Sequence, residues 1–163
     1  MYPYEYRRRL PHLQPDFKII FVMFCTYLRW TLPPTARTIV VDTCLEGDGL
    51  KFNLWGLVVM PDHVHLAFTP IYLPQGPVPI AEIMQAIKGT SAHRINKLLS
   101  RRGRVWQEES FDRALRNEEH LTEKLYYMLG NPVRAALVVN PLDYPWLWRR
   151  TVPAFPVQIN DVS

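Results

Sequence analysis

Cysteine is scarce in this chain of 163 residues, and long hydrophobic runs are missing. The two cysteines, Cys25 and Cys44, have apolar neighbours and no metal-site spacing. This setting favours two small buried residues in a reducing cytoplasm over a disulfide or a metal site. The longest apolar run, Ile19–Cys25, is far shorter than the roughly 20 residues of a membrane-spanning helix. We therefore expect no membrane partner.

Acidic residues are missing from one long stretch, Lys88–Gln107. The whole chain has a formal net charge of +4 and a pI near 9.2, which is modest evidence for a polyanionic partner. Apolar residues at helical spacing predict a helix there, with a basic ridge that is suited to bind phosphates. The basic segment Arg7-Arg8-Arg9 is suited to bind phosphates as well. A plain solvated helix face would give the same pattern. The basic residues of the stretch are Lys88, Arg94, Lys97, Arg101, Arg102 and Arg104.

Two histidines, His63 and His65, stand one residue apart after the turn-like pair Pro61-Asp62. If this segment is an extended strand, both imidazoles point to one face and Val64 points to the other, because side chains alternate along a strand. The two rings could then share one divalent cation. Histidines on the polar face of an ordinary amphipathic strand are the alternative, so the pair needs a third ligand and a reacting group.

A second pattern supplies both groups. We expect residues 117–131 to form a helix that begins at Asn117 and stops at Gly130. Tyr127 and Asn131 are four residues apart and therefore neighbours on one polar ridge, whereas Tyr126 borders the apolar stripe. An ordinary amphipathic helix with a surface tyrosine is the alternative. The predicted apolar stripe consists of Leu121, Leu125, Met128 and Leu129.

The order of these and other motifs resembles the Y1 transposases of the IS200/IS605 type, within the HUH endonuclease superfamily. It resembles the REP-associated tyrosine transposases most of all. No single piece is specific, but the ordered set is, and it covers roughly residues 7–148. The matching segments are Arg9-Leu10-Pro11-His12, Val58-Val59-Met60-Pro61-Asp62-His63-Val64-His65-Leu66, Ile83-Met84-Gln85, Lys88-Gly89, Trp106-Gln107-Glu108-Glu109-Ser110-Phe111-Asp112-Arg113, Tyr127-x-x-x-Asn131-Pro132-Val133 and Asp143-Tyr144-Pro145-Trp146.

The resemblance implies a metal site and a nucleophile. It assigns His63, His65 and Asn131 to a divalent cation, Mg²⁺ or Mn²⁺, and Tyr127 to the attack on a DNA phosphodiester. A 5′-phosphotyrosine intermediate and a free 3′-hydroxyl would result. Asp62 stands where Asn is commoner in the family, which adds a candidate carboxylate beside the site.

The resemblance also implies a partner, single-stranded or hairpin DNA of the REP-like kind, and a place in the cytoplasm at the nucleoid. The basic residues Lys88, Arg94, Lys97, Arg101 and Arg102, together with Arg7, Arg8 and Arg9, would hold this DNA. The family includes dimers whose active sites combine two chains, and it also includes monomers. Homodimer and monomer therefore both stay open.

Two other classes of function fit part of the pattern. A nucleic-acid-binding module without catalysis would keep the basic residues and stack bases on its aromatic side chains. It would not need the histidines, the tyrosine and the asparagine in register. A metal-dependent hydrolase would use His63 and His65 to activate water and would leave Tyr127 incidental, with Asp62 as its local candidate base. Covalent attachment to DNA distinguishes the three classes.

The local patterns predict an α+β fold, with a ferredoxin-like antiparallel sheet covered by helices as in the family. We expect one domain over residues 1–163, with a core at about 7–148 and a Pro-rich tail at 149–163. Loops are expected at Pro70–Pro79 and, with acidic residues, at Glu108–Asp112. Strands are predicted at Phe17–Leu28, Lys51–Met60, His63–Thr69 and Val105–Gln107, and helices at Pro34–Leu45 and Ile80–Arg101.

Overall fold

The computed structural model describes residues 19–115 and 121–150. They contain a five-stranded sheet in the order β6-β1-β3-β2-β7, in which all neighbours are antiparallel. The predicted α+β class with an antiparallel sheet is confirmed. The strands are β1 (Ile19–Cys25), β2 (Phe52–Val59), β3 (His63–Pro70), β6 (Phe111–Leu115) and β7 (Leu147–Arg149).

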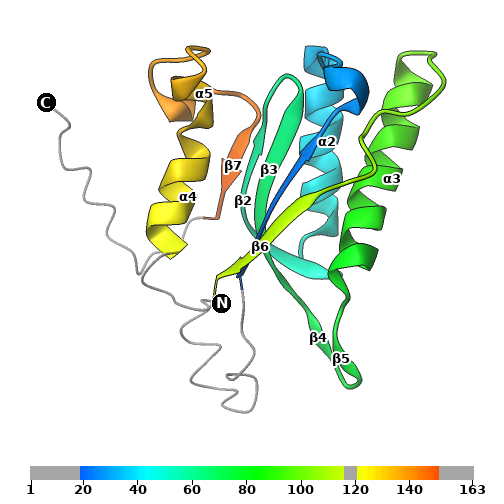
Figure 1. Ribbon diagram of the computed structural model, residues 1–163, viewed down its shortest axis with the longest axis vertical. Helices are drawn as coiled ribbons and strands as arrows, with labels where there is room; N and C mark the ends of the chain where they lie inside the picture. Colours follow the sequence, from blue (N-terminus) through cyan, green and yellow to red (C-terminus); the bar gives the residue numbers. More distant parts are fainter. Residues whose placement is uncertain (1–18, 116–120, 151–163) are drawn as a thin grey trace, which may run out of the picture.

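Helices lie on both sides of this sheet. Figure 1 shows α2 (Pro34–Gly47) and α3 (Ile80–Leu98) side by side on one face, and α4 (Leu121–Leu129) on the other. The short helix α5 (Asn131–Arg134) follows α4 almost directly. The sheet therefore has a pair of long helices on one face and the shorter helix α4 on the other.

The β2–β3 hairpin occupies the centre of the sheet. Strand β3 pairs with β1 on one side and with β2 on the other, and this register places Met23 and Val58 beside His65. Because both edges of β3 are hydrogen-bonded, its side chains have fixed directions. The predicted hairpin of two strands at 51–60 and 63–69 is confirmed.

The main hydrophobic core lies under α2 and α3. Val64, Leu66 and Phe68, which are alternate residues of β3, are fully buried there. Phe24 from β1 meets Trp106 edge-on, with ring centroids 4.9 Å apart. This face of the sheet therefore contains closely packed apolar side chains from β1, β2, β3, α2 and α3.

One predicted strand and one predicted loop are wrong. Residues Val105–Gln107 form only an isolated bridge from Trp106 to Thr26, and the edge strand β6 begins instead at Phe111, inside the predicted acidic loop. Trp106 is buried, and its Nε1–H donates to Ser91 Oγ on α3 at 3.0 Å. These contacts direct the segment Val105–Gln107 toward the core. At the sheet edge, charged side chains of β6 stay in solvent.

Smaller differences occur at element ends. The first strand ends at Cys25 and passes into the 3-10 turn η2 (Tyr27–Arg29). The predicted loop at 70–79 contains a small hairpin, β4 (Tyr72–Leu73) and β5 (Gly76–Pro77). Helix α3 runs through Gly89 without a break and ends three residues before the predicted Arg101.

The C-terminal motif closes the β2 edge of the sheet. After the 3-10 turn η4 (Pro141–Asp143), Tyr144 Oη donates to Val59 O at 2.7 Å, and Trp146 lies edge-on to Tyr144. Strand β7 then pairs with β2. Of the predicted tail, residues 151–163 lie outside the described residues.

The two cysteines are buried and free, as the sequence predicts. Burial raises the pKa of the Cys44 thiol to about 12, so the thiol stays protonated at neutral pH. Within residues 19–115 and 121–150, no helix is long and apolar enough to cross a membrane.

Candidate active site

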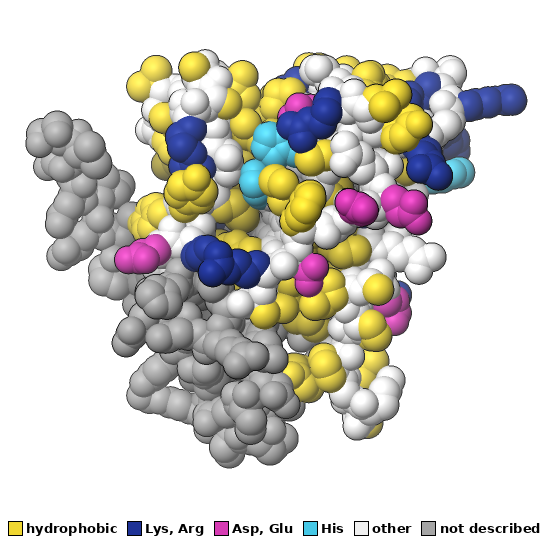
Figure 2. Space-filling model, in the orientation of Figure 1, with side chains coloured by type: hydrophobic (Ala, Val, Ile, Leu, Met, Phe, Trp, Pro, Cys, Tyr) yellow, Lys and Arg dark blue, Asp and Glu magenta, His cyan; other side chains and the backbone are white. Residues whose placement is uncertain are grey.

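His63 and His65 point together to the α4 side of the sheet, because Val64 between them is buried under α2 and α3. Their ring centroids are 4.9 Å apart, and the ring planes are inclined by 81°. Both imidazoles are only partly buried. Figure 2 shows histidine side chains at the surface beside the α4–α5 segment, with basic side chains on either side. The predicted alternation of the His-x-His motif is confirmed.

Asp62 determines which nitrogen of His63 carries the proton. Asp62 Oδ1 lies 2.7 Å from His63 Nδ1. Because a carboxylate can only accept, Nδ1 carries the hydrogen, and Nε2 is the ring nitrogen left for a metal. A histidine ligand that donates its other N–H to a carboxylate is the usual arrangement in protein metal sites.

Arg29 holds this carboxylate from the opposite side. Its Nε and Nη2 both lie 3.0 Å from Asp62 Oδ2. Burial raises the pKa of Asp62, but the hydrogen bond from His63 and the charge of Arg29 outweigh it and leave the pKa below its usual value. Leu28 and Arg29 adopt φ angles of 53° and 55°, which cost non-glycine residues roughly 1 kcal/mol or more each. The ion pair to Asp62 helps to hold this turn.

His65 is neutral near pH 7. Burial, the neighbouring His63 and the charge of Arg134 lower the pKa of His65 to about 4. Neutral imidazole retains the lone pair that a metal needs. The pair therefore presents two imidazoles, with ring centroids 4.9 Å apart, on one face of the sheet.

Helix α4 lies close to the sheet because Gly56 on β2 has no side chain. A Cβ at Gly56 would stand 2.8 Å from Met128 Cε and 3.1 Å from Leu125 Cδ2. Further along α4, Leu129 packs against Val58, which is the strand neighbour of His65. The C-terminal end of α4 thus points toward the histidine end of β3. Of the predicted apolar stripe, Met128 is buried and Leu125 and Leu129 are partly buried against the sheet.

Pro132 orients Asn131. Proline has no N–H to donate to the carbonyl of Met128 four residues earlier, and Asn131 Nδ2 donates to that oxygen instead, at 2.8 Å. The amide oxygen Oδ1 of Asn131 then remains as an acceptor. The predicted helix stop at Gly130 is confirmed, but Asn131 begins a further turn, α5, rather than ending α4. The predicted N-cap, Asn117, lies outside the described residues.

Tyr127 is the more exposed member of the tyrosine doublet, at 69% against 47% for Tyr126. Among the described residues, its hydroxyl has no hydrogen-bond partner. Arg134 lies over the Tyr127 ring, with Cζ 4.0 Å from the ring centroid. The predicted polar position of Tyr127 is confirmed, while Tyr126 packs less completely than predicted.

In the part of the chain that the structure describes, no three His, Cys, Asp or Glu side chains group as metal ligands. The oxygen ligand of the predicted set is the amide of Asn131. The donor set of two imidazoles and one amide oxygen fits a divalent cation that keeps open positions for phosphate and water.

The basic residues predicted to bind DNA lie on different sides of α3. Arg94 pairs with Glu46 of α2 at 2.7 Å, and Arg101 lies over the ring of Trp30 at 4.1 Å. Lys97 and Arg102 are exposed. Arg7, Arg8 and Arg9 lie outside the described residues.

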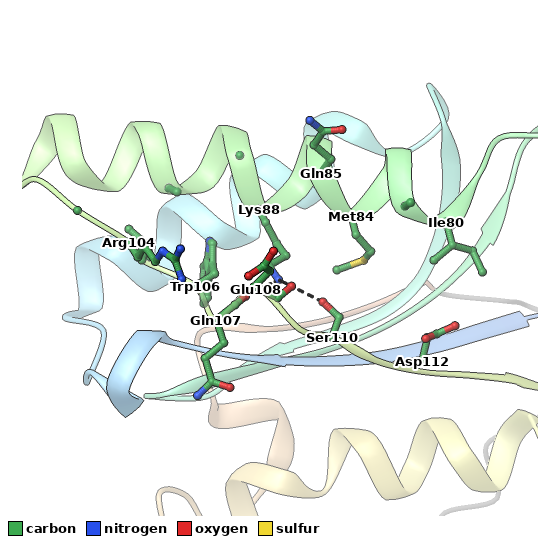
Figure 3. Close-up of a pocket in the computed structure, with 15 residues that line it drawn as sticks. Ile80, Met84, Gln85, Lys88, Arg104, Trp106, Gln107, Glu108, Ser110 and Asp112 are labelled. Carbon is green, nitrogen blue, oxygen red and sulfur yellow. Dashed lines mark hydrogen bonds between the residues drawn. The ribbon is translucent and has the colours of Figure 1, made fainter.

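Lys88 points inward. Its Nζ donates to Gln107 O at 2.6 Å and to Ser110 Oγ at 3.2 Å, where it joins α3 to the segment before β6 (Figure 3). The surrounding groove has a volume of about 800 Å³ and is lined by Met84, Trp106 and other residues of these two segments. It lies on the α3 side of the sheet, away from the histidines. Burial lowers the pKa of Lys88, although Glu108 opposes the shift.

Sequence reasoning missed two residues of this site, Arg29 and Arg134. Arg29 is 33 residues from Asp62 in sequence, and no local pattern links them. Arg134 is seven residues after Tyr127, on the same helical ridge, and continuing the Tyr127–Asn131 spacing by another turn would have found it.

Comparisons with known proteins concern the family and the fold. A family model described as "Transposase IS200 like" matches residues 22–117, a range that includes the histidine pair and ends before Tyr127. A REP-associated tyrosine transposase bound to a REP hairpin has a TM-score of 0.65 and 22% identity, over 80% of this chain and 75% of that chain. A candidate transposase from Deinococcus radiodurans R1 has a TM-score of 0.46 and 22% identity, over 71% of this chain and 90% of that chain. A search of the curated proteins found no match.

Proposed function

The chain belongs to the IS200-like family of transposases, whose model matches more than half of it, and on this premise we propose that it cuts and rejoins single-stranded DNA through a phosphotyrosine intermediate. Membership makes it an HUH-type enzyme that acts on DNA in transposition. The proposal concerns the chemistry and the residues. The observation that supports it is the pair of imidazoles, with ring centroids 4.9 Å apart, on the face of the sheet that α4 covers.

The metal-binding residues of the proposal are His63, His65 and Asn131. His63 would bind through Nε2, since Nδ1 donates to Asp62. Asn131 would bind through Oδ1, since Nδ2 donates to Met128 O. This mixed nitrogen and oxygen set suits Mn²⁺ or Mg²⁺. A bound cation would polarise the scissile phosphate and offset its charge.

Tyr127 is the proposed nucleophile. Its Oη forms a bond to phosphorus while the bond from phosphorus to the 3′ oxygen breaks. The phenol loses its proton to solvent and the 3′ oxygen gains one, which leaves a 5′-phosphotyrosine and a 3′-hydroxyl. The energy of the phosphodiester is kept in the new bond, so a 3′-hydroxyl can reverse the reaction without a nucleotide cofactor. A free phenol has a pKa near 10 and needs help at neutral pH.

The proposed substrate is single-stranded or hairpin DNA. The structurally similar REP-associated transposase is bound to a REP hairpin. In this chain the exposed Lys97 and Arg102 supply positive charge for phosphates. Such a substrate would place the protein at the nucleoid, as a monomer or as a homodimer.

The test is covalent capture of DNA. The protein is incubated with hairpin DNA labelled at its 5′ or 3′ end, in the presence of Mn²⁺, and separated under denaturing conditions. We expect an adduct that carries the 3′ segment, and we expect Tyr127→Phe to abolish it, because this variant keeps the ring and loses only the nucleophilic oxygen. Tyr126→Phe is the matched control and should retain the adduct.

Each other outcome identifies a different function. Cleavage without an adduct in both variants would mean that a metal-activated water attacks, as in a hydrolase. Binding of metal and DNA without cleavage would mean a binding module. Loss of the adduct in Tyr126→Phe alone would keep the mechanism and move the nucleophile by one residue.

A further inference from the structure

Arg134 of α5 makes two contacts with Tyr127, although it is a surface arginine. Its guanidinium lies over the Tyr127 ring at 4.0 Å, and its Nη2 donates to the carbonyl oxygen of Tyr127. A Cβ on Gly130 would stand 2.7 Å from Arg134 Nη1. The side chain of Arg134 therefore reaches Tyr127 by passing over Gly130, which has no side chain. The guanidinium is therefore held beside the proposed nucleophile.

The charge of Arg134 has no acidic partner in the described part of the chain. Arg134 is exposed, and among the described residues no carboxylate pairs with it. A cation that lies over the ring of the proposed nucleophile without such a partner is suited to bind an anion there.

We infer that Arg134 is a catalytic residue that binds the non-bridging oxygens of the scissile phosphate. This inference rests on the proposed function. A phosphate attacked by Tyr127 has to lie within bonding reach of Oη and beside the imidazoles. Arginine has five N–H donors in a planar fork that matches phosphate, and the bond to Tyr127 O uses only one Nη2 hydrogen. The remaining donors stabilise the charge of the phosphate as the P–O bond changes.

The test measures single-turnover adduct formation at saturating hairpin DNA with Mn²⁺. We expect Arg134→Gln to slow this step by about 100- to 1000-fold, and Arg134→Lys to recover part of the rate. Millimolar guanidinium should partly rescue Arg134→Ala. A merely structural role would predict no rescue, because millimolar guanidinium leaves the free energy of unfolding almost unchanged.

Arg37 provides the matched control. Its guanidinium also lies over an aromatic ring, that of Trp146 at 4.7 Å, and its Nε donates to the carbonyl oxygen of Leu32 at 2.9 Å. It belongs to α2, on the other side of the sheet. Arg37→Gln should leave the adduct rate unchanged. For both Arg37→Gln and Arg134→Ala, the change in adduct rate should not correlate with the change in the midpoint of thermal unfolding.

A binding measurement separates this inference from the proposed function. Tyr127→Phe cannot form the adduct, so the Kd for hairpin DNA with Mn²⁺ is compared between Tyr127→Phe and the double variant Tyr127→Phe/Arg134→Gln. A loss of about tenfold in affinity supports the phosphate contact even if the wild-type protein forms no adduct. Equal Kd values overturn the inference, as does an undiminished adduct rate in Arg134→Gln.

Discussion

The face of the sheet beneath α2 and α3 and the face beneath α4 are made from the same strands, but their side chains differ in kind. Beneath α2 and α3, Val64, Leu66 and Phe68 of β3 are fully buried in one large apolar cluster. Beneath α4, the alternate residues His63 and His65 are only partly buried, and the apolar clusters there are small. One strand therefore contributes to the packed core on one side and to the proposed metal site on the other.

The comparison shows how the side chains of the proposed metal site can be held firmly without being fully buried. Strand β3 is hydrogen-bonded on both sides, and its inward side chains resist movement because cores are densely packed. The imidazoles on the outward side gain this rigidity without being fully buried. Substitutions on the two faces should therefore affect different properties, and the predictions below test that separation.

The largest effect is expected from the metal-binding pair. His63→Ala and His65→Ala should each weaken Mn²⁺ binding by about a thousandfold or more, since even outer-shell partners contribute about 10- to 100-fold. Their unfolding free energy should change by less than about 1 kcal/mol, as is usual away from the core. Calorimetric titration with Mn²⁺ and urea unfolding measure the two quantities. The control is His93→Ala, because His93 is an exposed histidine of α3. Unchanged Mn²⁺ binding in both His63→Ala and His65→Ala would contradict the proposed metal site.

The converse substitution lies one residue away. Leu66→Ala should lower the unfolding free energy by about 2–5 kcal/mol, because it leaves a cavity in the core under α2 and α3. At a temperature where the variant is folded, its Mn²⁺ affinity should stay close to that of the wild type. Urea unfolding gives the first number and calorimetry the second. If Leu66→Ala lost metal affinity as severely as His65→Ala, the two faces would not be separable.

A smaller effect is expected at Asp62. Asp62→Ala removes the acceptor for His63 Nδ1–H and should weaken Mn²⁺ binding by about 10- to 100-fold. Asp62→Asn keeps an acceptor oxygen and should lose less. The imidazole ¹⁵N shifts of His63 report the tautomer directly. A wild-type tautomer and affinity in Asp62→Ala would show that the carboxylate does not orient the ring.

The local parts of this site were predictable from the sequence. Alternation along a strand and the spacing of a helix are properties of short segments, so His63 and His65 on one face, and Tyr127 with Asn131 beyond the apolar stripe, follow from the chain alone. Contacts between distant segments do not. Arg29 reaches Asp62 across 33 residues, and only the folded structure brings them together.

The misplaced edge strand has a similar cause. Val105 and Trp106 are residue types that favour strands, but tertiary packing buries them in the core. They form one isolated bridge, between Trp106 and Thr26, the residue after β1. The strand forms at Phe111–Leu115, where Asp112 and Arg113 are exposed and an edge tolerates them. A one-dimensional pattern cannot tell which of two neighbouring segments packs inward.

The smallest effect is expected on the α3 side, where basic residues would attract DNA electrostatically and take no part in the reaction. Neutralising Lys97, Arg101 and Arg102 together should weaken DNA binding across sequences and reduce its salt dependence by roughly one unit of slope per lost phosphate contact. The rate of adduct formation at saturating DNA should stay unchanged, because none of the three residues contacts the histidines or Tyr127 in the described part of the chain. Arg94→Gln is the control and should have less effect per charge, since Arg94 is already paired with Glu46 at 2.7 Å. An unaltered salt slope in the triple variant would locate the DNA-binding surface elsewhere, whereas a slowed rate at saturation would extend the active site across the sheet.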